Sequence, residues 1–215
     1  MPRLREIPRD ELDDDYLKGL YKMLFGERDP VAEPGTATGT PGNWWTVFAQ
    51  VPDAFKHTTE GFGFYRSPNR VLSDQLRELG QTRAGYVVGS KIVYSQHMKA
   101  ARYSGLTEEQ VDAIANWSIA TCFDPKERAV LAYTDALVLE YGRVSDSLFD
   151  ELKKHLSEVE IIELTYITCT YMMHAVMSRA FKLEYDDVAE RVVEIPAPEG
   201  TSADVMGMVD NRGKA

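Results

Sequence analysis

The chain has 215 residues, of which 44% are hydrophobic and 27% are charged, so it can bury a core of ordinary globular size. This composition excludes disordered and collagen-like chains, which hold too little apolar surface to repay the entropy of ordering. The 34 acidic residues outnumber the 24 basic ones and give a formal net charge of −10. Such a charge disfavours nucleic acids and anionic membranes as partners, because their phosphates would be repelled.

No stretch of the sequence approaches the ~18 consecutive apolar residues of a membrane span, and the N-terminus lacks the apolar run of a secretory signal. We therefore expect a cytoplasmic protein that binds neither membrane nor nucleic acid. Cys122 and Cys169 lie far apart, so they form neither a CxxC motif nor a set of zinc ligands. We expect reduced thiols, no metal and no cofactor.

Helical patterns begin near the N-terminus. Residues 10–25 show an amphipathic pattern, with Asp10 as the expected N-cap and Gly26 as the stop. Residues 29–42 are rich in proline, glycine and threonine and predict an extended loop. Pro52 is expected to lie in the first turn of a second helix.

From Val71 onward the helical signals are continuous. They predict a helix over residues 71–84, a break bracketed by Gly85 and Gly89, and a helix over residues 90–104. Further starts are predicted at the capping boxes of Thr107 and Ser157, and at the N-caps Asp124 and Ser145.

The longest apolar stretch is 161–181, and no alternating strand pattern appears. The prediction is an all-α, single-domain helical bundle with six or more helices. An N-terminal arm and loop cover residues 1–42, the helical domain covers 43–185, and a tail of small and polar residues covers 186–215.

The residues with chemical potential lie between Glu78 and Gly105. Ser90, Tyr94 and His97 fall on one stripe of the predicted helix over residues 90–104. Glu78 lies nineteen residues before His97, a separation of ~28 Å along one straight helix. If the chain reverses at the intervening glycines, the carboxylate can approach the imidazole to ~3 Å, a pair suited to acid–base work.

Three features follow one another in the sequence: Glu78, a helix-breaking stretch, and a helix that carries His97 before the segment GLTEEQVDAI. Together they resemble the carboxymuconolactone decarboxylase and alkyl hydroperoxidase D-like superfamily. The later run DPKERAVLAYTDALVLEYGRVSDSLFDELKKHLSEVEIIELTYITCTYMM resembles the downstream helices of its decarboxylase-like branch. The resemblance implies the helical bundle of that superfamily, over about residues 43–185, and a homo-oligomer, trimer or hexamer.

The departures from the family pattern limit the chemistry. The peroxidase branch places a CxxC motif between its Glu and its His, and here Ser90 and Val93 stand at the cysteine positions. Neither side chain can cycle through a disulfide. The decarboxylase-like branch carries an acidic residue four positions before its His, where this chain has Val93. The resemblance therefore implies proton transfer by His97 with Glu78 or Tyr94, without thiol peroxidase activity.

Our leading hypothesis is a cofactor-free lyase or decarboxylase-type enzyme of aromatic compound catabolism, acting on a small cyclic or unsaturated carboxylic acid or lactone. His97 is the expected acid–base residue and Glu78 orients it. The expected substrate-binding residues are Ser90, Val93, Tyr94, Tyr171 and His174.

Each of these hypotheses has an alternative. The chain can be a non-catalytic oligomeric binding or structural relative of the enzymes. In that case Glu78 forms an ion pair with Arg83 or another cation, Ser90 caps a helix, and His174 is a core histidine.

Overall fold

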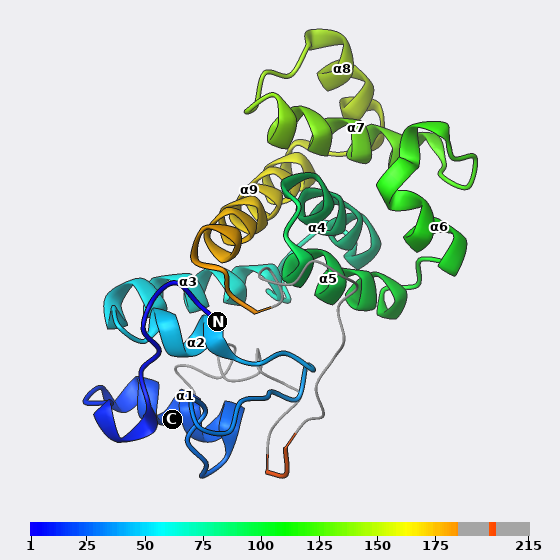
Figure 1. Cartoon of the computed structure of the whole chain (residues 1–215). Coiled ribbons are helices and arrows are strands. Elements are labelled where there is room, and N and C mark those ends of the chain that lie inside the picture. Colours follow the sequence, from blue (N-terminus) through cyan, green and yellow to red (C-terminus); the bar gives the residue numbers. More distant parts are fainter. Residues whose placement is uncertain (185–197, 201–215) are drawn as a thin grey trace. The chain divides into compact units, whose positions relative to one another are not determined.

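The computed structural model describes residues 1–184 and 198–200 (Figure 1). Every regular element in these residues is a helix, which confirms the all-α prediction. The α-helices are α1 (Asp15–Phe25), α2 (Asn43–Phe48), α3 (Pro52–Tyr65), α4 (Asp74–Val88), α5 (Lys91–Tyr103), α6 (Glu108–Ala113), α7 (Pro125–Leu139), α8 (Asp146–His155) and α9 (Glu158–Phe181). Two 3₁₀-helices accompany them, η1 (Arg9–Glu11) and η2 (Ile114–Ile119).

The chain that we expected to form one bundle divides by its contacts into two compact units. Unit 1 holds Met1–Pro68 together with the described residues from Ala180 on, and unit 2 holds Asn69–Arg179. The predicted boundaries at residues 42 and 185 come from sequence resemblance and stay a prediction. The predicted tail over 186–215 lies outside the described residues, except for 198–200.

In unit 1, helix α1 begins later than the sequence pattern predicts. The carboxylate of Asp14 accepts hydrogen bonds from the backbone N–H groups of Tyr16 (3.0 Å) and Leu17 (3.1 Å), so Asp14 is the N-cap. The predicted cap, Asp10, lies in η1, and Leu12 follows that turn in an extended conformation. Gly26 ends the helix as expected.

The buried carboxylate of Glu184, three residues beyond the end of α9, binds the start of α2. Glu184 accepts hydrogen bonds from the backbone N–H groups of Gly42 (3.0 Å) and Trp44 (2.8 Å). These groups are among the N–H donors that a helix start leaves without an intrahelical partner. Burial raises the pKa of Glu184 to about 7.

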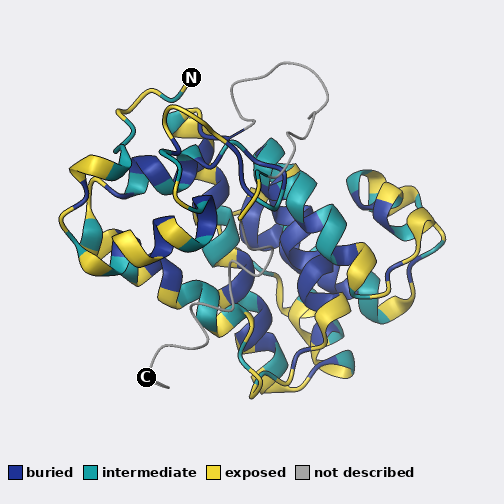
Figure 2. Ribbon diagram, turned by 90° about the horizontal axis from the view of Figure 1, so that it is seen from below, coloured by how far each residue is buried: buried dark blue, intermediate teal, exposed yellow. Residues whose placement is uncertain are grey.

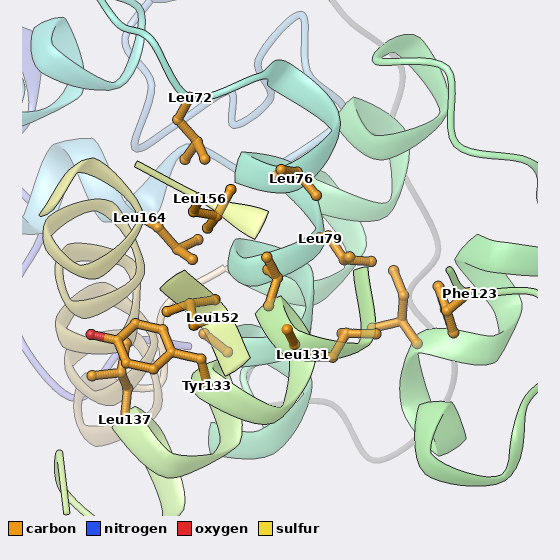
Figure 3. Packing of buried hydrophobic residues seen from close by; sticks show 14 of the residues in the cluster. Leu72, Leu76, Leu79, Phe123, Leu131, Tyr133, Leu137, Leu152, Leu156 and Leu164 are labelled. Carbon is orange, nitrogen blue, oxygen red and sulfur yellow. The ribbon is translucent and has the colours of Figure 1, made fainter. Parts of the chain in front are cut away.

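Unit 2 is built around leucines from α4, α7, α8 and α9, among them Leu79, Leu131, Leu152 and Leu164 (Figure 3). Coloured by burial, the helices carry buried residues interspersed with exposed ones, as expected of amphipathic helices (Figure 2). This core fixes α4, the helix that carries Glu78.

Helices α4 and α5 form a hairpin that corrects the predicted break. Helix α4 continues through Gly85 and ends at Gly89, whose φ of 78° suits a glycine C-cap. A Cβ at Gly85 would lie 2.8 Å from the backbone nitrogen of Tyr94 and 2.8 Å from Cγ1 of Val93. Gly85 therefore allows the two helices to approach closely and does not interrupt the helix.

Polar contacts hold both ends of α4. Near its start, the N–H groups of Val71 (3.0 Å) and Leu72 (2.7 Å) donate to the buried carboxylate of Glu163 on α9. Farther along, Arg83 donates to both oxygens of Asp135 on α7, at 2.7 and 3.0 Å. The position of the hairpin is thus set by neighbouring helices on either side.

The remaining helix starts in unit 2 agree with the sequence. Capping boxes are present at Thr107 and Ser157, and Asp124 caps α7. The sequence predicts one helix from Thr107 to about residue 119, but the α-helix ends at Ala113 and the chain continues as the 3₁₀-helix η2, inside which Asn116 has a non-helical φ of −125°.

Candidate functional site

The hairpin brings Glu78 and His97 together. Oε2 of Glu78 lies 2.8 Å from Nδ1 of His97, and the two side chains are on neighbouring helices of unit 2. Glu78 is 0% exposed and His97 is 8% exposed. The hydrogen bond expected from a chain reversal is therefore present. A buried carboxylate and imidazole are held in direct contact.

A second group holds the other oxygen of this carboxylate. Arg77 donates to Oε1 of Glu78 from Nε (3.1 Å) and from Nη2 (2.8 Å), and its Nη1 donates to Asp74 at 2.7 Å. Asp74 also accepts from Arg70. The buried Glu78 is thus shared between a guanidinium and an imidazole, one on each oxygen.

Sequence reasoning missed the role of Arg77. It offered Arg83 or another cation as the alternative ion-pair partner of Glu78; the cation is Arg77, because Arg83 is bound to Asp135. The sequence signal for an ion pair of Arg77 was its i, i+3 spacing from Asp74, because side chains at that spacing meet on a helix surface.

The electrostatics of the pair select one tautomer of the histidine. A neighbouring guanidinium favours the ionised form of a carboxylate, and an ionised carboxylate only accepts hydrogen bonds. Nδ1 of His97 must then carry a proton and donate it to Glu78. In the neutral ring this leaves the lone pair on Nε2, the nitrogen that can take a proton from another molecule.

Helix α9 adds two rings to this group. The ring of Tyr171 lies edge-on to that of His97, with 4.4 Å between centroids and an interplanar angle of 87°. Tyr171 also contacts His174 at 5.8 Å. Burial, and secondarily the charge of His97, lower the pKa of His174 to about 4, so His174 is neutral at neutral pH.

The other predicted site residues of α5 have local contacts. Ser90 is the N-cap of the helix, its hydroxyl accepting from the N–H of Val93 at 3.4 Å, as its structural alternative predicts. Val93 is buried where the two helices meet. The ring of Tyr94 packs against that of Tyr86, 5.4 Å away. Any substrate-binding role of these residues stays a prediction.

Cys122 and Cys169 are free cysteines and form no disulfide in the described part of the chain. Burial raises the pKa of both the Cys122 and the Cys169 thiols. Across residues 1–184 and 198–200, no cluster of three or more His, Cys, Asp or Glu side chains could hold a metal ion. No helix in the same residues has the length and apolar character needed to cross a membrane.

The part of the chain that carries the Glu78–His97 pair is similar to a known protein family. Residues 52–136, which include Glu78 and His97, match the model of the Carboxymuconolactone decarboxylase family. No curated protein matches the chain.

Several solved structures share the fold. A candidate antioxidant defence protein AhpD of unknown function from Agrobacterium tumefaciens is 23% identical, with a TM-score of 0.60 over 68% of this chain and 96% of that one. A cysteine-to-alanine variant of the debrominase Bmp8 in complex with 2,3,4-tribromopyrrole is 17% identical, with a TM-score of 0.64 over 82% and 89%. A peroxidase-related protein from Ralstonia eutropha JMP134 with an AhpD core is 13% identical, with a TM-score of 0.61 over 84% and 93%.

Proposed function

We propose that this chain is a member of the carboxymuconolactone decarboxylase and AhpD-like superfamily, whose family model matches residues 52–136, and that it is a cofactor-free enzyme of the lyase or decarboxylase type. Its substrate would be a small cyclic or unsaturated carboxylic acid or lactone. His97 would move the proton and Glu78 would hold its ring. The observation that carries the proposal is the 2.8 Å contact between these two buried side chains.

The proposed reaction needs one proton-transfer group. In a decarboxylation, the bond between a ring carbon and the carboxylate breaks and carbon dioxide leaves. The electron pair stays on the ring carbon, where conjugation with a carbonyl spreads its charge. The imidazolium of His97 then delivers its proton to that carbon, and Glu78 stabilises the imidazolium before the transfer.

The rings beside His97 support a proton-transfer role. His174 is neutral at neutral pH because of its low pKa, so it does not compete with His97 for the proton. The ring of Tyr171 packs edge-on against the imidazole and restricts its orientation. The positions that hold thiols in the peroxidase branch are Ser90 and Val93, which argues against a peroxidase.

We further propose that the protein self-associates, as the superfamily resemblance implies. The alternative to the enzyme remains a non-catalytic oligomer that kept the scaffold. The Glu78–His97 pair favours the enzyme, because leaving two ionisable groups buried has a cost that an apolar pair would avoid.

The test is a substrate screen with matched histidine variants. Carboxymuconolactone and a panel of small lactones and unsaturated acids are supplied to the purified protein, and substrate loss is followed by absorbance and mass spectrometry. His97→Ala is expected to lower kcat by about 10²–10⁴-fold, the usual range for a general acid–base group. Glu78→Gln is expected to cost less, because it keeps the shape and part of the hydrogen bonding.

The matched control is His155→Ala. His155 also contacts a glutamate, Glu151 at 3.3 Å, but on the surface helix α8. The His155→Ala variant should leave turnover unchanged. Equal turnover by the His97→Ala and wild-type proteins, with circular dichroism showing intact helices, would exclude the proposed role and favour the non-catalytic oligomer.

A further inference from the structure

The side-chain amide of Gln81, on α4 in unit 2, is buried. The residue is 0% exposed, and within residues 1–184 and 198–200 neither its Oε1 nor its Nε2 has a hydrogen-bond partner. Burying an amide in this way is unfavourable, because the hydrogen bonds that it makes to water in the unfolded chain are lost. Native proteins keep few such groups, and each one calls for an explanation.

Two buried threonines of unit 2 differ from Gln81 in what their own helices can offer. Thr134 and Thr168 are 0% exposed, and their hydroxyls have no hydrogen-bond partner in the described part of the chain. A threonine inside a helix can turn its hydroxyl to the carbonyl four residues earlier. Oε1 of Gln81 instead needs a donor, and the backbone N–H groups inside a helix are already engaged. Its partner must therefore come from outside α4.

Gln81 lies on the side of α4 that faces α5. It follows Glu78 by three residues, which places it about 60° around the helix and about 4.5 Å along it. Gly85 follows four residues later, and a Cβ there would lie 2.8 Å from the backbone nitrogen of Tyr94 on α5. Glu78, Gln81 and Gly85 therefore share one face of the helix.

Helix α9 lies on the adjoining side of α4. A Cβ at Gly80, the residue before Gln81, would lie 3.0 Å from Oγ1 of Thr168 on α9. Gln81 thus lies between the direction of α5 and that of α9. These two helices meet where the ring of Tyr171 packs against that of His97, with 4.4 Å between centroids. The amide of Gln81 is directed toward this junction.

We propose that Gln81 binds the ligand of the Glu78–His97 site, and that this ligand presents a carbonyl oxygen beside an N–H or O–H group. A primary amide carries an acceptor oxygen and a donor N–H side by side. A group with the reverse order forms two parallel hydrogen bonds with it. Lactams, carboxamides and undissociated carboxylic acids have this arrangement, whereas a lactone offers acceptors only.

The inference rests on the proposed function, since it takes a small molecule to bind beside His97, and it narrows the class of that molecule. Nδ1 of His97 is engaged by Glu78, so Nε2 is the nitrogen that meets the ligand. Two hydrogen bonds to Gln81 would fix the orientation of the ligand against Nε2. Of the two proposed classes, carboxylic acids and lactones, an undissociated acid engages both atoms of the Gln81 amide and a lactone engages one.

The test compares two rings of the same size, 2-pyridone and 2-pyranone, which differ in an N–H and an oxygen beside the carbonyl. Their binding to the full chain is measured by calorimetry. The wild-type protein should bind 2-pyridone at least about tenfold more tightly, because 2-pyranone leaves Oε1 of Gln81 without a donor. Gln81→Leu, which removes both polar atoms and roughly keeps the size, should bind the two rings equally.

Benzamide and benzoic acid then separate the two sources of this chemistry. Benzamide keeps a donor beside its carbonyl at every pH, whereas benzoic acid keeps one only while undissociated. Tighter binding of benzamide at neutral pH assigns amides and lactams. A benzoic acid affinity that rises about tenfold per unit decrease in pH, and does so only with Gln81 present, assigns acids. Affinities that do not depend on Gln81 for either compound contradict the proposal.

The matched control is Thr134→Val. Thr134 is buried like Gln81, but its Oγ1 lies 3.4 Å from the Cβ position of Gly80, on the side of α4 away from the Gln81 face. Its variant should keep the discrimination between the two rings. Without ligand, Gln81→Leu should melt a few degrees higher than the wild-type protein, because an apolar side chain removes the cost of the buried amide. A lower melting temperature would show that the amide has a structural partner, such as a buried water, and would refute the proposal.

Three binding results would also overturn it: a wild-type protein that does not bind 2-pyridone, equal affinity for the two rings, or a discrimination that Gln81→Leu retains. None of these measurements uses turnover. A protein that binds 2-pyridone through Gln81 and converts no substrate would refute the proposed reaction and leave the role of Gln81 standing.

Discussion

Replacing Gly85 by alanine tests whether the close approach of α4 and α5 sets the geometry of the candidate site. In the middle of a helix, alanine is favoured over glycine by about 1 kcal/mol. At Gly85, however, the new methyl group would lie 2.8 Å from the backbone nitrogen of Tyr94 and 3.1 Å from its Cα. Backbone atoms cannot move aside without shifting α5, and overpacking of this kind costs about 1–3 kcal/mol.

The balance is a net destabilisation of up to about 2 kcal/mol, or a melting temperature lower by a few degrees. Thermal unfolding followed by circular dichroism measures it. Gly19→Ala in α1 is the matched control, because nothing lies within 4 Å of the Cβ that it would add. That variant should gain about 0.5–1 kcal/mol from helix propensity alone.

The same substitution should also reduce any turnover, since moving α5 separates His97 from Glu78. If Gly85→Ala stabilises the protein as Gly19→Ala does, the two helices can separate without strain. The inferred function of this glycine would then be wrong.

Three further predictions concern titration and thiols. His174 has a pKa lowered to about 4, so between pH 6.5 and 4 the unfolded chain binds a proton that the folded protein does not. The free energy of unfolding should therefore drop by roughly 2 kcal/mol between pH 8 and 5. Urea titrations of His174→Asn should show that this part of the loss is abolished. Glu184 has a pKa raised to about 7, so its contribution to the free energy of unfolding is fully present below pH 4.5 and is lost as the pH rises through 7. Glu184→Gln should remove roughly 2–3 kcal/mol of that pH dependence between pH 5 and 8. A pH profile of stability that this variant leaves unchanged would contradict the raised pKa of Glu184. The double variant Cys122→Ala, Cys169→Ala should keep any native turnover, and hydroperoxide turnover that disappears in this variant would show that thiols take part.

The helix starts were predictable because their signals are local. Thr107, Asp124 and Ser145 each place a side-chain oxygen within reach of an N–H three residues later, and nothing distant competes. The first helix was misplaced for the same kind of reason. Asp10 and Asp14 are both chemically suitable caps, and only the extended backbone at Leu12 decides between them.

The contacts across helices were harder to predict. The Glu78–His97 pair could be anticipated from family resemblance and from glycines that permit a reversal. Arg77 binds Glu78, whereas Arg83 binds Asp135. Which arginine binds which carboxylate depends on the face of α4 that meets α7. Similarly, Gly85 is chemically able to break a helix or to admit a neighbour, and the packing of α5 decides which it does.

The hydrogen bonds on Glu78 have a thermodynamic consequence for ligand binding. Arg70, Asp74, Arg77 and Glu78 form a chain of two cations and two anions that ends on His97. Protonation of His97 adds a positive charge at the end of this chain, and an anionic ligand beside the ring would offset that charge. Proton uptake and carboxylate binding should therefore be coupled. Calorimetric titration with a carboxylic acid, in buffers of different ionisation enthalpy, would measure the protons taken up. A heat independent of the buffer would mean that the anion enters without a proton.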